Sequence, residues 1–228
     1  VNTLGSEKLA QMASMAGVRR FVYVSSIKVN GESTGPVGIG GGKKFSAGDA
    51  SNPTGAYAWS KWQAEKALQT IASGSDMEVT VVRPPIVYGP GVKANFLRLL
   101  MAIDRGVPFP FASVSNRRSL VALDNLVDFL CQCVEHPRAA GETFLVSDGQ
   151  DLSTPELIRR IAALMDRPAR LVPIPVRLVL LAGRLLNQRD VVERLAGSLQ
   201  LDIGKSRSLL GWSPPVLTDC ALEETVEW

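Results

Sequence analysis

The pattern of hydrophobic positions along the chain alternates between short apolar runs and longer segments with helical spacing. Val18–Val24 and Val79–Val82 are rich in Val, and runs of this kind predict buried strands. The alternation of strands and helices predicts an α/β fold with a parallel sheet and helical crossovers. The other predicted elements are a strand at Thr143–Val146 and helices at Asn2–Ala16, Ala56–Ala72, Leu123–Glu135, Thr154–Met165, Val176–Leu186 and Ile203–Leu210.

Local signals support several helix boundaries. Ser153 and Glu156 stand in the order of a capping box at the start of Thr154–Met165. Gly211 ends the last of the predicted helices. Val176–Leu186 is strongly apolar, but it contains two arginines and is too short to span a membrane. It predicts an amphipathic helix packed within the protein, with contact to a membrane surface or a partner as the alternative.

The composition is that of a protein with a substantial core. The chain has 228 residues, of which 46% are hydrophobic, enough for one large domain or two small ones. Its net charge of +3 is small and its basic residues are dispersed, which argues against a nucleic-acid partner. Cys131, Cys133 and Cys220 lack metal-ligand spacing, so we expect reduced thiols of a cytoplasmic protein and no metal site. The single histidine, His136, precedes Pro137 and predicts a helix end rather than a catalyst.

A tyrosine and a lysine lie four positions apart near the start of a predicted helix. Residues at this spacing share one helix face, so Lys61 can place its ammonium near the phenol of Tyr57. A positive charge favours a phenolate, which makes Tyr57 a candidate general acid and base. Ser25 and Ser26 follow the first predicted strand, at the edge where doubly wound sheets bind ligands. A serine hydroxyl there can hold the oxygen that gains or loses the proton.

Taken alone, this pair is equally compatible with an exposed Tyr–Lys contact on a helix. Two further segments flank it: Phe21–Glu32 (FVYVSSIKVNGE) and Val82–Gly91 (VRPPIVYGPG). In order and spacing, the three motifs resemble the extended short-chain dehydrogenase/reductases, specifically the NAD-dependent epimerase/dehydratase family acting on nucleotide sugars. The resemblance runs through nearly the whole chain, and three ordered motifs are far more specific than one.

The resemblance implies the C-terminal part of a Rossmann-type doubly wound parallel sheet with a smaller mixed α/β substrate domain. Residues 1–91 and 119–147 would form part of the dinucleotide-binding domain, and residues 92–118 and 148–228 the substrate domain. The family begins with a strand, a glycine-rich turn and a helix that hold the cofactor pyrophosphate. Residues 1–6 instead resemble the helix before the serine strand, so we expect roughly 100 further residues upstream, about three βα units.

A second glycine-rich stretch does not replace that turn. Gly35, Gly38 and Gly41 have the spacing of the family's glycines, but no apolar strand precedes them and no convincing helix follows. We predict instead that Gly31–Gly55 is a long active-site loop.

By position, the family's catalytic triad falls on Ser26, Tyr57 and Lys61. Ser26 is preferred to Ser25 because it lies five residues before Gly31, as the catalytic Ser or Thr does in the family. Ser25 would then support the site from behind.

On the cofactor side, the resemblance implies NAD, with NADP as an alternative. Lys61 would hydrogen-bond the nicotinamide ribose, a role that suits a flexible point charge. The segment that follows the strand Val79–Val82 resembles the lining of the nicotinamide pocket, and a plain proline-ended strand with a turn is the alternative. The implied cofactor contacts are Ser25, Tyr57, Lys61, Pro84, Ile86 and Val87.

The substrate contacts implied by the resemblance are Ser26, Asn95, Phe109, Phe111 and Arg118. Asn95 matches an Asn at a helix start near the diphosphate, and Arg118 matches an arginine on the diphosphate or ribose. The alternatives are a helix-capping role for Asn95 and core packing, rather than uracil contact, for the two phenylalanines. Arg194 is a second and loosely aligned candidate for the diphosphate.

Together these residues predict a nucleotide-sugar C4 epimerase acting on a UDP-hexose or UDP-N-acetylhexosamine. One alternative is an NAD(P)H-dependent reductase of a UDP-4-keto-6-deoxy sugar. Another is an inactive fragment or a binding protein of the same fold, because fold alone does not fix function. The family also implies a cytoplasmic homodimer, assembled through the helices Asn2–Ala16 and Ala56–Ala72, with no integral membrane segment.

Overall fold

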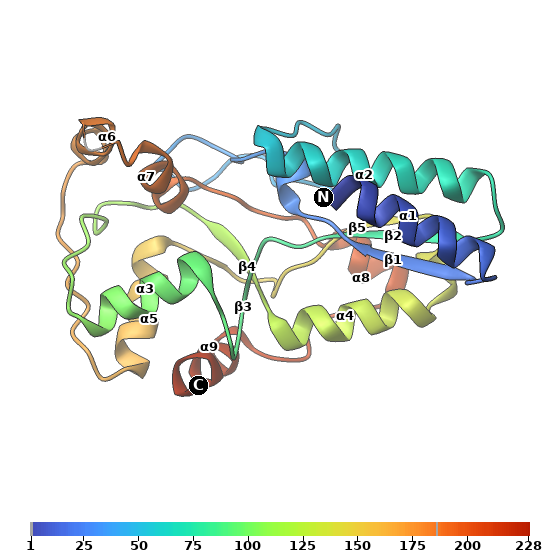
Figure 1. The fold of residues 1–228 in the computed structure, drawn as a ribbon. Coiled ribbons are helices and arrows are strands. Elements are labelled where there is room, and N and C mark those ends of the chain that lie inside the picture. Colours follow the sequence, from blue (N-terminus) through green and yellow to red (C-terminus); the bar gives the residue numbers. More distant parts are fainter. Residues whose placement is uncertain (1, 186) are drawn as a thin grey trace.

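The structure is a computed structural model that describes residues 2–185 and 187–228. Figure 1 shows a parallel sheet with helices on both faces at one end of the molecule, and a second group of helices beside a smaller sheet. The helices are α1 (Asn2–Met15), α2 (Gly55–Ser73), α3 (Ala94–Asp104), α4 (Leu123–Glu135), α5 (Thr154–Leu164), α6 (Val176–Leu185), α7 (Arg189–Ala196), α8 (Gly204–Leu210) and α9 (Thr218–Glu227), with 3-10 turns η1 (Ile27–Val29) and η2 (Pro137–Ala139). The strands are β1 (Arg20–Val24), β2 (Glu78–Arg83), β3 (Ile86–Tyr88), β4 (Arg118–Ala122), β5 (Thr143–Leu145) and β6 (Asp151–Leu152).

The first sheet has the strand order β1-β2-β5 and is parallel throughout. In its register Tyr23 lies opposite Val81, and Val82 lies opposite Phe144. The helices α1 and α2 cover one face, while α4 and α8 cover the other (Figure 1). The predicted α/β class with helical crossovers is therefore confirmed.

β2 is buried on both faces, as its continuous apolar run predicted. Val79 and Val81 pack toward the helices α1 and α2. Val82 packs on the other side with Phe129 of α4 and Phe144 of β5. Successive side chains of a strand point to opposite faces, so this strand holds the two layers of helices together.

The second sheet contains β3, β4 and β6, with β3 parallel and β6 antiparallel to β4. Tyr88 at the end of β3 is buried, and its ring stacks on that of Phe96 in α3 with 5.6 Å between centroids. Ile158 of α5 and Leu222 of α9 belong to the same core. This sheet and its helices therefore form a second core beside the first.

The predicted elements are present, with ends shifted by one or two residues. The capping box forms, because the Glu156 N–H donates to Ser153 Oγ (3.2 Å) and the Ser153 N–H donates to Glu156 Oε2 (2.7 Å). Gly211 ends α8 with a φ of 66°, as a C-terminal glycine does. The predicted helix Val176–Leu186 is α6, and its expected last residue lies outside the described residues.

α8 departs from the predicted grouping, in which residues 148–228 form the substrate domain. Ile203, Leu210 and Trp212 pack with Phe129 in the core of the first sheet. The ring centroids of Trp212 and Phe129 lie 4.8 Å apart. The sequence identified the helix, but its periodicity says nothing about which of two cores the apolar face enters. The division into two domains otherwise stays a prediction.

We predict that Phe129→Ala strongly destabilises the protein. The ring is fully buried and meets Phe144 and Trp212 edge to face, so its removal leaves a cavity between the sheet and two helices. The expected loss in the free energy of unfolding is about 3–5 kcal/mol, measured by urea denaturation. The control is Val127→Ala on the exposed side of α4, which should change the stability by about 0.5 kcal/mol or less. Equal losses in both variants would contradict this account of the core.

Candidate active site

α2 places Lys61 at the carboxyl end of β1. Lys61 Nζ donates a 2.9 Å hydrogen bond to the carbonyl oxygen of Val24, the last residue of that strand. The ammonium also lies 4.9 Å from the centroid of the Tyr23 ring, within cation–π distance. Burial lowers the pKa of Lys61 below its usual 10.5, and the negative charge of Glu65 opposes this effect. An ammonium has three donors, so this one keeps others for a ligand.

Tyr57 lies one helical turn before Lys61, so the predicted helix pair is present. The residue is 52% exposed, which leaves the phenol open to a bound molecule. Gly55 begins α2 with a φ of 79°, a conformation that favours glycine. The chain can therefore turn sharply from the loop into the helix just before the tyrosine.

The two serines after β1 have different partners. Ser26 caps the turn η1, and its Oγ accepts a 3.3 Å hydrogen bond from the N–H of Lys28. Its own hydroxyl proton is left for another acceptor. Ser25 is buried, and its hydroxyl hydrogen-bonds the carboxylate of Glu65. Ser26 therefore keeps a hydroxyl donor for a ligand, while Ser25 is held against Glu65. The catalytic role of Ser26 and the cofactor contact of Ser25 stay predictions.

Sequence reasoning missed a buried ion pair beneath these serines. Glu65 is 2% exposed and Arg83 is 6% exposed. Arg83 Nε donates to Glu65 Oε1 at 3.0 Å and Arg83 Nη2 donates to Oε2 at 2.5 Å. Two signals were present in the sequence. Glu65 follows Lys61 by four residues and so shares its helix face, and Arg83 ends a strand within the third motif.

The predicted cofactor segment continues this edge of the sheet. The carbonyl oxygen of Pro84 accepts a 3.0 Å hydrogen bond from the N–H of Ile27, which ties the end of β2 to η1. Ile86 and Val24 are both exposed, whereas Val87 packs partly against the first core. Exposed apolar side chains at this edge, with an ammonium bound to Val24, fit the ring and ribose of a nicotinamide nucleotide.

Arg118, the first residue of β4, is held by the C-terminal end of α7. Its Nη1 donates to the carbonyl oxygens of Arg194 (2.6 Å) and Gly197 (3.0 Å). Burial lowers the pKa of Arg118 to about 10, and the charge of Glu32 opposes the shift. Carbonyl partners carry no net charge, so the guanidinium keeps its charge for an anion such as a phosphate. The side chain of Arg194 is exposed, and its contribution here is the carbonyl oxygen.

The remaining substrate candidates lie on and after α3. Asn95 is exposed in the first turn of α3, and the cap position is Lys93, so Asn95 is not the cap. Phe109 and Phe111 are buried in the second core, although the Phe109 backbone pairs with Leu171 in a strand-like bridge. Their burial favours the core-packing alternative, and a contact with the substrate stays a prediction.

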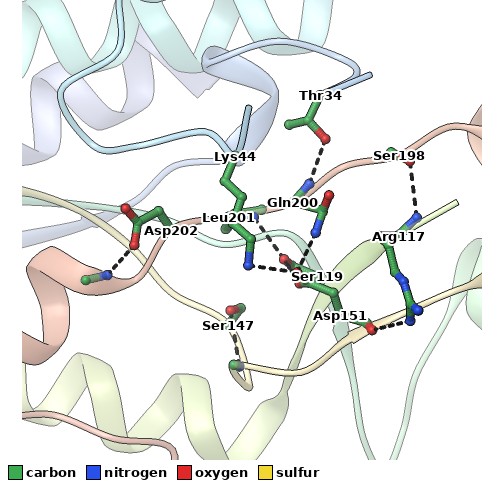
Figure 2. Close-up of polar contacts among 12 residues, drawn as sticks. Thr34, Lys44, Arg117, Ser119, Ser147, Asp151, Ser198, Gln200, Leu201 and Asp202 are labelled. Atoms are coloured by element: carbon green, nitrogen blue, oxygen red, sulfur yellow. Dashed lines mark hydrogen bonds and ion pairs between the residues drawn. The ribbon is translucent and has the colours of Figure 1, made fainter. Parts of the chain in front are cut away.

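The glycine-rich loop between η1 and α2 crosses from the triad to the neighbourhood of Arg118. Figure 2 shows two of its residues, Thr34 and Lys44, beside the segment that carries Gln200. Thr34 Oγ1 accepts a 3.0 Å hydrogen bond from the Gln200 N–H, and Phe45 pairs with Leu201 in a parallel bridge. Residues 31–54 contain no helix, so the prediction of a loop is confirmed.

Asp151 anchors this loop and was not foreseen from the sequence. Its Oδ2 lies 3.1 Å from Lys44 Nζ and accepts a 2.8 Å hydrogen bond from Gln200 Nε2. The Ser119 hydroxyl hydrogen-bonds its other oxygen (Figure 2). Ser119, which follows Arg118, is therefore connected to the loop through the Asp151 carboxylate.

The described part of the chain shows neither a metal-binding group nor a membrane-spanning helix. Residues 2–185 and 187–228 hold no group of three His, Cys, Asp or Glu side chains placed to bind a metal. Within the same residues, every helix is too short or too polar to cross a bilayer. His136 ends α4 and its Nδ1 accepts the N–H of Arg138, which confirms the predicted helix end.

Known proteins resemble the chain over its whole length. The sequence model of the NAD dependent epimerase/dehydratase family matches residues 1–147. The chain is 46% identical over 228 residues to a UDP-glucose 4-epimerase of Vibrio cholerae, covering 100% of the chain and 68% of that protein. It is 31% identical over 236 residues to a UDP-glucose 4-epimerase of Mycolicibacterium smegmatis, with coverage of 100% and 68%.

A solved structure shares the fold. The UDP-glucuronic acid 4-epimerase from Bacillus cereus in complex with NAD matches with a TM-score of 0.77 and 17% identity, covering 99% of this chain and 66% of that one. The chain therefore spans about two thirds of the length of these proteins. The Rossmann-type fold and the family resemblance predicted from the motifs are both confirmed.

We predict that Lys61 makes stability rise with pH in the alkaline range. Its lowered pKa means that the folded protein binds fewer protons than the unfolded chain as the pH approaches 10.5, so the free energy of unfolding increases there. Urea midpoints measured from about pH 8 upward should rise more in the wild type than in Lys61→Met, which lacks the titrating group. The same pH slope in both proteins would contradict a partly buried ammonium at this position.

Proposed function

Because the chain belongs to the NAD dependent epimerase/dehydratase family, we propose that this protein is a nucleotide-sugar C4 epimerase that uses NAD. Its substrate is a UDP-hexose or a UDP-N-acetylhexosamine. The observation that carries the proposal is the hydrogen bond from Lys61 Nζ to the Val24 carbonyl. This bond fixes the helix face of Tyr57 and Lys61 at the strand edge where Ser26 follows.

Each residue at this edge has a separate role in the reaction. Tyr57 takes the proton of the C4 hydroxyl and returns it in the second half of the reaction. Ser26 donates a hydrogen bond to the same oxygen, and Lys61 lies one turn after Tyr57 on the same helix face, where its ammonium can bind the cofactor. When bound, NAD would take the hydride from C4 and give it back to the opposite face of the sugar.

The diphosphate of the substrate is assigned to Arg118. Its guanidinium is mostly buried yet bound by neutral carbonyls, an arrangement that favours an anion from outside. Asn95 in the exposed first turn of α3 is the second candidate, since free backbone donors lie at that helix end. Binding the diphosphate away from the triad leaves the sugar to reach Tyr57.

The proposal includes a cytoplasmic homodimer that forms through α1 and α2. Large apolar side chains on these helices are exposed, which supports contact with a second copy of the chain. The three cysteines are free thiols, which supports a reducing compartment. The exposed side chains are Leu4, Leu9, Met12 and Met15 of α1 and Trp59 of α2.

The reaction is tested with full-length protein and two substrates. UDP-glucose and UDP-N-acetylglucosamine are incubated separately with catalytic NAD, and the expected products are the C4 epimers. Net consumption of NADH or NADPH with a UDP-4-keto-6-deoxy sugar, without epimer formation, would favour the reductase instead. Absence of both reactions in protein that retains NAD would favour a binding role.

We predict that Tyr57→Phe lowers kcat by about 100-fold or more while the protein stays folded. The change removes only the hydroxyl that carries the proton. Tyr88→Phe is the matched control, since the Tyr88 hydroxyl bonds Asp148 in the second core, and its kcat per folded molecule should be retained. Substantial turnover by Tyr57→Phe would refute the assigned role.

We predict that Arg118→Lys raises KM for the UDP-sugar by about 10-fold and leaves kcat nearly unchanged. Lysine keeps the charge but cannot offer the forked donors that suit a diphosphate. The matched control is Arg117→Lys, because its neighbour Arg117 is exposed and pairs with Glu156. A similar rise of KM in both variants would point to a general charge effect rather than a diphosphate contact.

A further inference from the structure

The Glu65–Arg83 ion pair lies where three separate segments of the site meet. Glu65 is on α2, two turns after Tyr57, and Arg83 is the last residue of β2. The Ser25 hydroxyl binds the Glu65 carboxylate from the end of β1. Each of these segments carries a proposed site residue close to its contact with the pair.

The pair also holds the glycine-rich loop at both of its ends. Arg83 Nη1 donates a 2.9 Å hydrogen bond to Oδ1 of Asn30, where the loop begins. Arg83 Nη2 lies 3.4 Å from Oγ of Ser51, near the end of the loop. Asn30 in turn donates to the carbonyl oxygen of Ser46 (3.0 Å). One guanidinium therefore connects the start, the middle and the end of the loop to the strand edge.

Stability alone does not explain a buried ion pair at this place. Taking two charges out of water costs as much as their attraction returns, and apolar residues of similar volume are often as stable. The charged groups around Glu65 are Arg83 on β2 and Lys61 on α2, with the Tyr23 phenol on β1. An ion pair forms directional hydrogen bonds, and apolar side chains do not. Each carboxylate oxygen and each guanidinium N–H therefore holds its partner in one position.

We propose that Glu65 and Arg83 are positioning residues, whose ion pair holds the Ser25–Ser26 strand end and the Asn30 turn against the α2 face that carries Tyr57 and Lys61. Neither residue touches the substrate. They act through Ser25 and Asn30, and the inference rests on the proposed epimerase function.

The first test is Glu65→Gln in the full-length protein. Glutamine keeps the volume and removes the charge that draws Arg83 and Ser25 together. We expect kcat for UDP-sugar epimerisation to fall on the order of 10- to 100-fold, since displacements of about 1 Å have effects of this size. KM for the UDP-sugar should change by less than about threefold, because the diphosphate is bound at Arg118.

The matched control is Glu78→Gln. Glu78 of β2 pairs with Arg20 of β1 at 2.7 Å, at the opposite end of β2 from Arg83. The Arg20 side chain is as buried as that of Arg83. We expect kcat of Glu78→Gln within about twofold of the wild type. Wild-type kcat in Glu65→Gln, or equal losses in both variants, would overturn the proposal.

A double variant separates positioning from stability. In Glu65→Met/Arg83→Met both charges give way to apolar side chains of similar length. The urea midpoint should fall less than in Arg83→Met alone, which leaves the Glu65 carboxylate buried without its ion-pair partner. We expect its kcat to be as low as that of Glu65→Gln. A stable double variant with wild-type kcat would show that the pair only fills space.

Hydrogen exchange gives a readout that does not depend on activity. The Asn52 N–H donates to the Val29 carbonyl at 2.9 Å, and such loop amides should exchange faster in Glu65→Gln than in Glu78→Gln. Equal exchange in the loop of both variants would overturn the proposal. If the wild type epimerises no UDP-sugar, the proposed function fails, and the exchange result still decides whether the pair holds the loop.

Discussion

The parallel pairing of β1 with β2 is the constraint on which the rest of the structure depends. It brings the carboxyl ends of the two strands to one edge, so that Val24 lies opposite Val82 and the serines lie next to Arg83 and Pro84. β2 is buried on both faces, and a shift of register by one residue would turn its core side chains to the wrong layer. The position of the site is therefore fixed by the core rather than by the loops around it.

Three cations of the proposed site, Lys61, Arg83 and Arg118, fall into two groups according to their partners. Lys61 and Arg118 are bound by neutral carbonyl oxygens, so burial is offset by hydrogen bonds while the charge stays uncompensated by a contacting carboxylate. Arg83 is instead paired with the Glu65 carboxylate, which neutralises its charge. The first group is suited to act on a cofactor or substrate, and Arg83 is suited to hold the backbone that presents them.

Long segments with a clear period were predictable, and so was the shared helix face of Tyr57 and Lys61. α2, β2 and α4 have apolar patterns strong enough to set their type, and the Tyr57–Lys61 spacing follows from helix geometry. Glu65 and Arg83 each left a local signal in the sequence, but their contact was missed because it joins residues 18 apart that meet only after the helix has packed on the sheet. The packing of α8 was missed for the same reason, since the apolar pattern of a helix does not indicate which of two cores the helix packs against. The carbonyl partners of Arg118 are backbone groups, which leave no trace in the sequence.

The glycine-rich loop links the two sides of the site by contacts that can be followed one by one. It begins at Asn30, bound to Arg83, and it pairs through Phe45 with Leu201. The segment of Leu201 also contains Leu199, which forms a bridge to Arg118. A diphosphate bound at Arg118 would therefore steady the same segment that anchors the loop, and the loop is anchored again beneath the serines. Binding of the diphosphate, far from the reacting oxygen, can in this way stabilise the arrangement of the residues around that oxygen.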